Sequence, residues 1–199
     1  YDAVFSKLNL PGTTIKLNNR KILAGIAEII GAADKLIDFT VALDKLDKIG
    51  ADGVSKEMME KGISEQAIEK VKPLFNFHGS NQNKLDQLAI LLAESIQGTK
   101  GVEDLRFVVD NVEKFGLESA KLFIDVTLAR GLNYYTGAIF EVKTNEVAMG
   151  SIGGGGRYDD LTGMFGLKNL TGVGVSFGAD RIYGRHCKFV CFGVLIKGF

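Results

Sequence analysis

Residues 122–142 read LFIDVTLARGLNYYTGAIFEV, and this stretch decides the fold class of the chain. Its beginning, 122–126, is apolar and strand-like, and 134–142 holds aromatic and β-branched residues that suit a second strand. Residues 147–152 and 172–178 add two further candidate strands. Short strands separated by tight turns predict an antiparallel sheet.

Helical periodicity dominates the sequence that precedes this sheet. Apolar residues recur at helical spacing through 34–118, for example at Leu85, Leu88 and Leu92. Within this stretch a short helix is predicted to begin at Ser64 and to end at Pro73. Nearer the start, 15–17 alternates as a short strand, and the pair at 18–19 can cap a helix that follows it.

These patterns predict an α+β fold, in which an antiparallel sheet flanked by helices carries an α-helical insertion subdomain. The predicted parts are a first segment of the sheet domain at 1–33, the helical subdomain at 34–118, the remainder of the sheet domain at 119–183, and an atypical tail at 184–199. The chain begins at Tyr1, already inside an amphipathic pattern, which suggests a fragment of a longer protein.

Composition excludes several classes of function. Lys plus Arg equals Asp plus Glu, at 24 each, so there is no basic surplus of the kind that favours non-specific nucleic-acid binding. No apolar run is long enough for a membrane span, and no signal-peptide pattern opens the chain. Cys187 and Cys191 make no disulfide framework, and with His186 they fit no common zinc pattern. We therefore expect a cytoplasmic protein without a bound metal of its own.

Residues 128–137 contain the densest group of chemically useful side chains. Arg130 carries a planar fork of donors that matches carboxylate or phosphate oxygens. Adjacent residues on a strand point to opposite faces, so we expect Tyr134 and Tyr135 to have different environments, one facing the working surface and the other the core or a neighbouring loop. The alternative is that Arg130 is a surface cation and both tyrosines belong to the core.

Two glycine-rich stretches follow. The run at 153–156 exposes backbone N–H and C=O groups on which a ligand could lie, although it matches neither a P-loop nor a dinucleotide-binding fingerprint. A flexible turn is the alternative. Between 172 and 178 glycines alternate with larger residues, so that one face could receive a flat ring such as adenine, with Arg181 stacked on it or reaching phosphate. Close packing between strands is the alternative there.

Taken in order, these three features resemble one family, the histidyl-tRNA synthetases. Residues 130–137 resemble its histidine-specific signature, and 155–159 resemble its second histidine-pocket segment. The stretch 172–178 with Arg181 resembles motif 3 of class II synthetases. The helical stretch sits where the family has its insertion domain, so the resemblance covers residues 1–183.

The resemblance implies ATP-dependent activation of histidine to histidyl-adenylate, followed by transfer to tRNA(His). Arg130 would be catalytic, contacting the α-phosphate and the histidine carboxylate. It also implies Mg²⁺ with the ATP, a homodimer in the intact enzyme, and an insertion domain that helps to clasp the tRNA acceptor end. The implied histidine-binding residues are Arg130, Tyr134, Tyr135, Tyr158, Gly155 and Gly156, and the implied ATP-binding residues are Gly178 and Arg181.

The chain departs from the family in several places. Asn133 stands where many members have Asp, and neither motifs 1 and 2 nor an anticodon-binding domain is found, so this chain is expected to be inactive alone. The tail shows no helical stripe and is interpreted as non-native. One alternative is a non-catalytic relative that senses histidine or tRNA, but such relatives tend to lose the run at 130–135. Another is an α+β interaction module with structural glycines.

Overall fold

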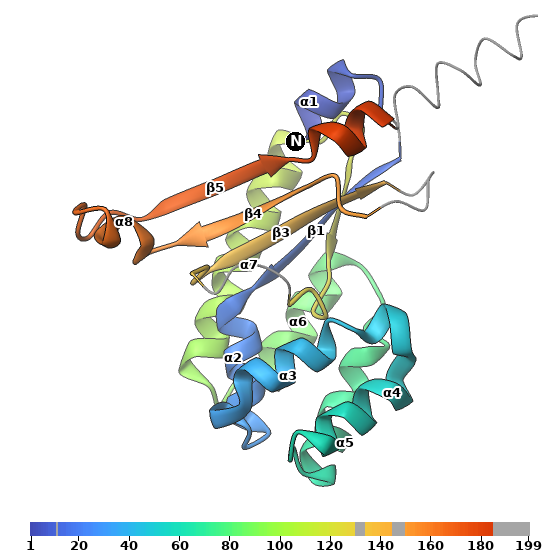
Figure 1. The fold of residues 1–199 in the computed structure, drawn as a ribbon, viewed down its shortest axis with the longest axis vertical. Coiled ribbons are helices and arrows are strands. Elements are labelled where there is room, and N and C mark those ends of the chain that lie inside the picture. Colours follow the sequence, from blue (N-terminus) through green and yellow to red (C-terminus); the bar gives the residue numbers. More distant parts are fainter. Residues whose placement is uncertain (11, 130–133, 145–149, 185–199) are drawn as a thin grey trace, which may run out of the picture.

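The computed structural model describes residues 1–10, 12–129, 134–144 and 150–184, arranged as a helix-flanked sheet (Figure 1). A 3₁₀ helix, η1, covers Ala33–Lys35, and residues 179–184 at the end of the described chain are helical. The other elements, in chain order, are α1 (Asp2–Lys7), β1 (Thr13–Asn19), α2 (Arg20–Ile29), α3 (Leu36–Leu43), α4 (Leu46–Glu60), α5 (Glu65–Phe75), α6 (Asn81–Leu91), α7 (Ile96–Phe115), β2 (Lys121–Ile124), β3 (Ala138–Thr144), β4 (Gly153–Tyr158), α8 (Leu161–Met164) and β5 (Gly172–Phe177).

The five strands form one sheet in the order β2-β1-β3-β4-β5. The pairs β1–β3, β3–β4 and β4–β5 are antiparallel, whereas β1 and β2 are parallel, with Leu17 opposite Ile124. A parallel pair needs a long crossover, and here helices α2 to α7 provide it. The predicted α+β class with a helix-flanked sheet is confirmed. The sheet is mixed and not wholly antiparallel, because β1 and β2 are parallel.

Two strand predictions differ from the structure. The strand predicted at 134–142 begins only at Ala138, so both signature tyrosines precede it. The strand predicted at 147–152 lies partly outside the described residues, and β4 instead starts at Gly153 and contains the whole glycine run. Glycine has low intrinsic β propensity, so this strand is set by pairing with β3 on one side and β5 on the other.

The main hydrophobic core lies between the sheet and the helices. It joins Leu17 of β1, Ile26 of α2, Phe39 of α3, Leu88 of α6 and Leu105 of α7, each at most 3% exposed. Figure 1 shows α2 to α6 gathered on one side of the strands, while α1 lies near the end of β5. A smaller cluster at α1 joins Phe5 to Val142 of β3 and to Ile152, which directly precedes β4.

Helix α7 lies very close to α2 because glycines face the contact. A Cβ on Gly25 would lie 2.5 Å from the Cα of Gly98, and one on Gly101 would lie 2.8 Å from the backbone nitrogen of Ile22. The last helix of the predicted insertion thus packs on the first segment of the chain. The domain boundaries at 33 and 118 stay predictions. Within the described part of the chain, no helix is both long and apolar enough to cross a membrane.

An ion pair secures the chain where it leaves β2. The Nζ of Lys16 lies 2.6 Å from Oδ2 of Asp125, and the other carboxylate oxygen accepts hydrogen bonds from the backbone N–H and the hydroxyl of Thr127. Burial alone would raise the pKa of Asp125, but these hydrogen bonds outweigh burial and hold the pKa below its ordinary value. The pair therefore stabilises the fold only while Asp125 is ionised.

Asp125→Asn is expected to remove this stabilisation. A carboxyl with a lowered native pKa contributes stability above its unfolded pKa of about 4, and that contribution is lost as the pH falls through the native pKa. At pH 7 the substitution should lower the free energy of unfolding by about 1.5–3 kcal/mol, typical of a charged hydrogen bond. Below pH 4 the mutant and wild type should converge in urea unfolding. A mutant–wild-type gap that persists undiminished at pH 2 would contradict this, and Asp34→Asn, at an exposed position on η1, is the control.

Candidate functional site

The tyrosines of the first signature lie in a turn before β3, where their rings touch. The centroids of Tyr134 and Tyr135 are 4.8 Å apart with an interplanar angle of 61°. The expectation that they face opposite sides of the sheet is wrong, because strand alternation does not apply to residues that precede the strand. Arg130, the implied catalytic residue, lies with Asn133 outside the described residues.

The second signature segment supplies a third ring to the same cluster. Tyr158 is the last residue of β4, and its ring centroid lies 6.0 Å from that of Tyr134 in an edge-to-face arrangement of 87°. Burial, together with a hydrogen bond to Tyr134, raises the pKa of Tyr135 to about 12. The structure therefore brings Tyr134, Tyr135 and Tyr158 together, and a phenol hydroxyl can both donate and accept hydrogen bonds.

Hydrogen bonds join the two signature segments to each other. The backbone N–H of Thr136 donates to the carbonyl of Arg157 at 2.9 Å, and its hydroxyl donates to Oδ2 of Asp159 at 2.7 Å. The Nε of Arg157 donates to Oδ1 of Asp159 at 3.0 Å. Burial alone would raise the pKa of Asp159, but these bonds outweigh it and lower the pKa. No role was inferred for Asp159 from the sequence, although it directly follows Tyr158.

The glycine-rich strands make room for these rings. A Cβ on Gly156 would lie 2.8 Å from the ring of Tyr135, and one on Gly172 would lie 2.3 Å from the ring of Tyr158. A Cβ on Gly155 would lie only 2.0 Å from the carbonyl oxygen of Gly174 in the neighbouring strand. The backbone of β4 and β5 thus forms the floor under the tyrosine cluster. Direct contact of Gly155 and Gly156 with histidine stays a prediction.

Gly178 and Arg181 lie at the other end of the same strands. The N–H of Gly178 donates to the carbonyl of Ile152 at 2.9 Å, and Nη1 of Arg181 donates to the carbonyl of Ser151 at 2.5 Å. Because Tyr158 pairs with Gly172 at the opposite end of β4, about 17 Å of extended strand separates the two groups. If both groups serve one reaction, its substrates must extend along β4 and β5.

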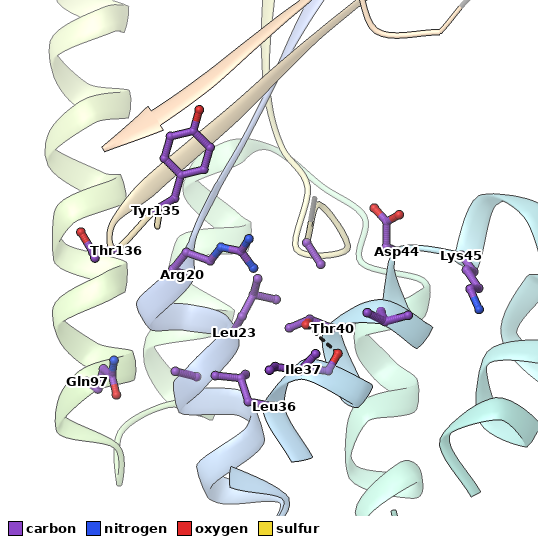
Figure 2. Close-up of a pocket in the computed structure, with 13 residues that line it drawn as sticks. Arg20, Leu23, Leu36, Ile37, Thr40, Asp44, Lys45, Gln97, Tyr135 and Thr136 are labelled. Atoms are coloured by element: carbon purple, nitrogen blue, oxygen red, sulfur yellow. Dashed lines mark hydrogen bonds between the residues drawn. The ribbon is translucent and has the colours of Figure 1, made fainter. Parts of the chain in front are cut away.

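A cavity of about 660 Å³ opens beside the tyrosine cluster, between α2, α3 and the turn that carries Tyr135 (Figure 2). In Figure 2 the Arg20 side chain extends from α2 toward the middle of this space. Burial lowers the pKa of the Arg20 guanidinium. Sequence reasoning missed the cavity, because Arg20, Asp44, Gln97 and Tyr135 come from four segments far apart in the chain.

The described residues contain no group of three or more His, Cys, Asp or Glu side chains that could hold a metal ion. We assign Mg²⁺ to no residue of the chain. The segment with His186, Cys187 and Cys191 lies outside the described residues.

Comparisons with known proteins agree on one family. A family model for histidyl-tRNA synthetase matches residues 2–182. A curated histidine–tRNA ligase of Flavobacterium johnsoniae is 71% identical over 92% of this chain, which spans only 39% of that relative's length. The crystal structure of histidyl-tRNA synthetase from Nostoc sp. PCC 7120 has a TM-score of 0.85 and 34% identity, covering 93% of this chain and 44% of that one.

A more distant solved structure shares the fold, and at its low sequence identity the similarity concerns the fold alone. A protein from Bacillus halodurans C, described as an ATP phosphoribosyltransferase regulatory subunit/histidyl-tRNA synthetase, has a TM-score of 0.73 at 16% identity, covering 92% of this chain and 47% of that one. The family assignment rests on the model that matches residues 2–182, on the high identity of the relatives, and on the tyrosine cluster built from two signature segments. The chain belongs to the histidyl-tRNA synthetase family.

Proposed function

We propose that the protein containing this chain is a histidine–tRNA ligase, which activates histidine with ATP to histidyl-adenylate and transfers it to tRNA(His). The observation that carries the proposal is the tyrosine cluster. Tyr134 and Tyr158 come from segments that each resemble a histidine-pocket signature, and their rings meet edge to face. Membership of the family and 71% identity to a histidine–tRNA ligase support it.

The tyrosine cluster suits recognition of an imidazole. Tyr135, with its pKa raised to about 12, stays a neutral phenol at physiological pH and can bond a ring nitrogen as donor or acceptor. A site that hydrogen-bonds its substrate rejects analogues that leave those groups unpaired. In this proposal Tyr134, Tyr135 and Tyr158 provide specificity, and the backbone of Gly155 and Gly156 forms the floor of the histidine site.

The other residues would serve the phosphates and the adenine. Arg130 would hold the histidine carboxylate and the α-phosphate, stabilising the charge that grows at phosphorus during attack. At the far end of β4, Arg181 donates through Nη1 to Ser151, which leaves further guanidinium donors for the γ-phosphate and a planar face for adenine. Gly178 would lie beside the nucleotide, and Mg²⁺ would arrive bound to the ATP.

The remaining parts of the proposal concern the whole protein. The helical region at 34–118 would act as an insertion domain that contacts the tRNA acceptor end, and the intact enzyme would be a homodimer in the cytoplasm. Because this chain spans about two fifths of its curated relatives, we expect the 199 residues alone to be inactive.

The alternative is a regulatory relative that senses histidine or tRNA without catalysis. The fold alone does not separate the two, since a structure described partly as a regulatory subunit shares it at 16% identity. The run at 130–135 and the 71% identity to a histidine–tRNA ligase favour the enzyme.

The deciding experiment is ATP–pyrophosphate exchange by the full-length protein, with histidine, proline or threonine as the amino acid. The proposal predicts exchange with histidine and none above background with the other two. Binding of histidine without any exchange would favour the regulatory alternative instead.

A further inference from the structure

The outer edge of β2 is covered by a side chain of the helical region. Among the strands of the described residues, β2 is the last of the sheet on its side, so one row of its backbone groups has no strand partner there. The Nδ2 of Asn81 donates to the carbonyl of Leu122 at 3.0 Å, and Oδ1 of Asn81 accepts from the N–H of Ile124 at 2.9 Å. One amide at the start of α6 thus bonds β2 as a neighbouring strand would.

Lys84, one turn further along α6, is buried against the same strand. Only 1% of this residue is exposed, its Nζ donates to the carbonyl of Ile124 at 2.8 Å, and it lies 3.4 Å from the ring centroid of Phe123. Burial lowers the pKa of Lys84. Lysine is rarely buried to this extent, because desolvating an ammonium is unfavourable. The burial of Lys84 against β2 therefore suggests that its ammonium has a role other than filling space in the core.

Further backbone carbonyls between β2 and the signature also accept hydrogen bonds from a side chain. The Nδ2 of Asn18 on β1 donates to the carbonyls of Val126 at 3.1 Å and Leu128 at 2.9 Å. Lys84 and Asn18 together hold the carbonyls of residues 124, 126 and 128, so this stretch is fixed from the helical region and from the sheet. Ala129, which is buried, is the last described residue before Arg130 in the sequence.

Helix α6 is itself well anchored. Leu85 and Leu88 are fully buried in the main core. The helix therefore gives Asn81 and Lys84 a buried base, while their hydrogen bonds join it to residues 122–124.

We propose that Lys84 and Asn81 are positioning residues for histidine activation, through which the helical region fixes the segment that enters the signature. The inference rests on the proposed function. It concerns residues that neither resemble a synthetase motif nor line the tyrosine cluster, and it makes the helical region part of the support of the amino-acid site.

The test compares variants of the full-length protein in histidine-dependent ATP–pyrophosphate exchange. Lys84→Met keeps the aliphatic chain against Phe123 and removes the donor. Its kcat should fall on the order of 10–100-fold, the range that a displacement of about 1 Å produces, while the KM for ATP changes less than about threefold. Hydrogen exchange at the backbone amides of 125–129 should become faster.

Two further variants separate positioning from general destabilisation. Leu88→Ala removes packing from the same helix without touching β2, so its Tm should fall while kcat at 25 °C stays within about twofold of wild type. Asn81→Asp keeps the acceptor for Ile124 but loses the donor to Leu122, and an acid is favoured at the start of a helix. It should fold as stably as wild type and show a smaller kcat loss than Lys84→Met.

The outcomes are distinct. A wild-type protein without histidine-dependent exchange would overturn the proposed function and the positioning role with it. An active wild type, with Lys84→Met at full kcat or with Leu88→Ala equally impaired, would overturn the positioning role alone.

Discussion

Gly155→Ala should lower the free energy of unfolding by about 4 kcal/mol or more, a loss reached only by severe structural conflicts. A Cβ at this position would lie 2.0 Å from the carbonyl oxygen of Gly174 and 2.8 Å from the ring of Phe140. One neighbour is the backbone of the adjoining strand, so the clash can be relieved only by separating β4 from β5. Since domains of this kind are stable by about 5–15 kcal/mol, urea unfolding followed by circular dichroism should show a large fall in the transition midpoint.

Gly163→Ala is the matched control for this effect. Gly163 lies in α8, and a Cβ there would meet nothing within 4 Å. Alanine is preferred over glycine in helices, so the stability should stay within about 1 kcal/mol of wild type, on the side of higher stability. Equal stability of Gly155→Ala and Gly163→Ala would show that β4 and β5 are not paired as described.

Arg130→Ala in the full-length protein should reduce kcat for histidine-dependent ATP–pyrophosphate exchange by about 10²–10³-fold, the usual loss for one preorganised donor at a developing charge. In the proposed function this guanidinium would contact the α-phosphate and the substrate carboxylate. Because the interaction is strongest in the transition state, kcat should fall more than the KM for histidine rises.

The control is Arg106→Ala, which removes a guanidinium that bonds Gln82 and Asp86 across α6 and α7. An exposed ion pair of this kind contributes little, so exchange activity should stay near that of wild type. A loss in Arg130→Ala no larger than in Arg106→Ala would remove Arg130 from the catalytic machinery.

The helices could largely be predicted from local patterns. Ser64 caps α5 as expected, accepting a hydrogen bond from the N–H of Ala67, and Asn19 caps α2 in the same way. The prediction that the helix ends at Pro73 was wrong, because α5 continues to Phe75. Leu74 is buried in the main core, and this packing outweighs the single backbone hydrogen bond that the proline removes.

The sheet and the site depend on contacts between distant residues, which local patterns do not contain. The glycine run has the composition of a turn, yet it forms β4 because Gly155 pairs with Phe140 on one side and Val175 on the other. The tyrosines were identified from their signature, but the contact between their rings depends on the turn before β3. The edge contacts of Lys84 left no sequence signal, since a lysine on an amphipathic helix is expected to face solvent.

The most direct test of the central claim is calorimetric titration of the full-length protein with a non-hydrolysable histidyl-adenylate analogue and with its prolyl and threonyl counterparts. If the tyrosine cluster recognises the imidazole by hydrogen bonds, the histidyl analogue should bind about 10⁴-fold more tightly than the other two. Tyr135→Phe should narrow that preference. Comparable affinities for the three analogues in the wild-type protein would contradict the assignment of this site to histidine.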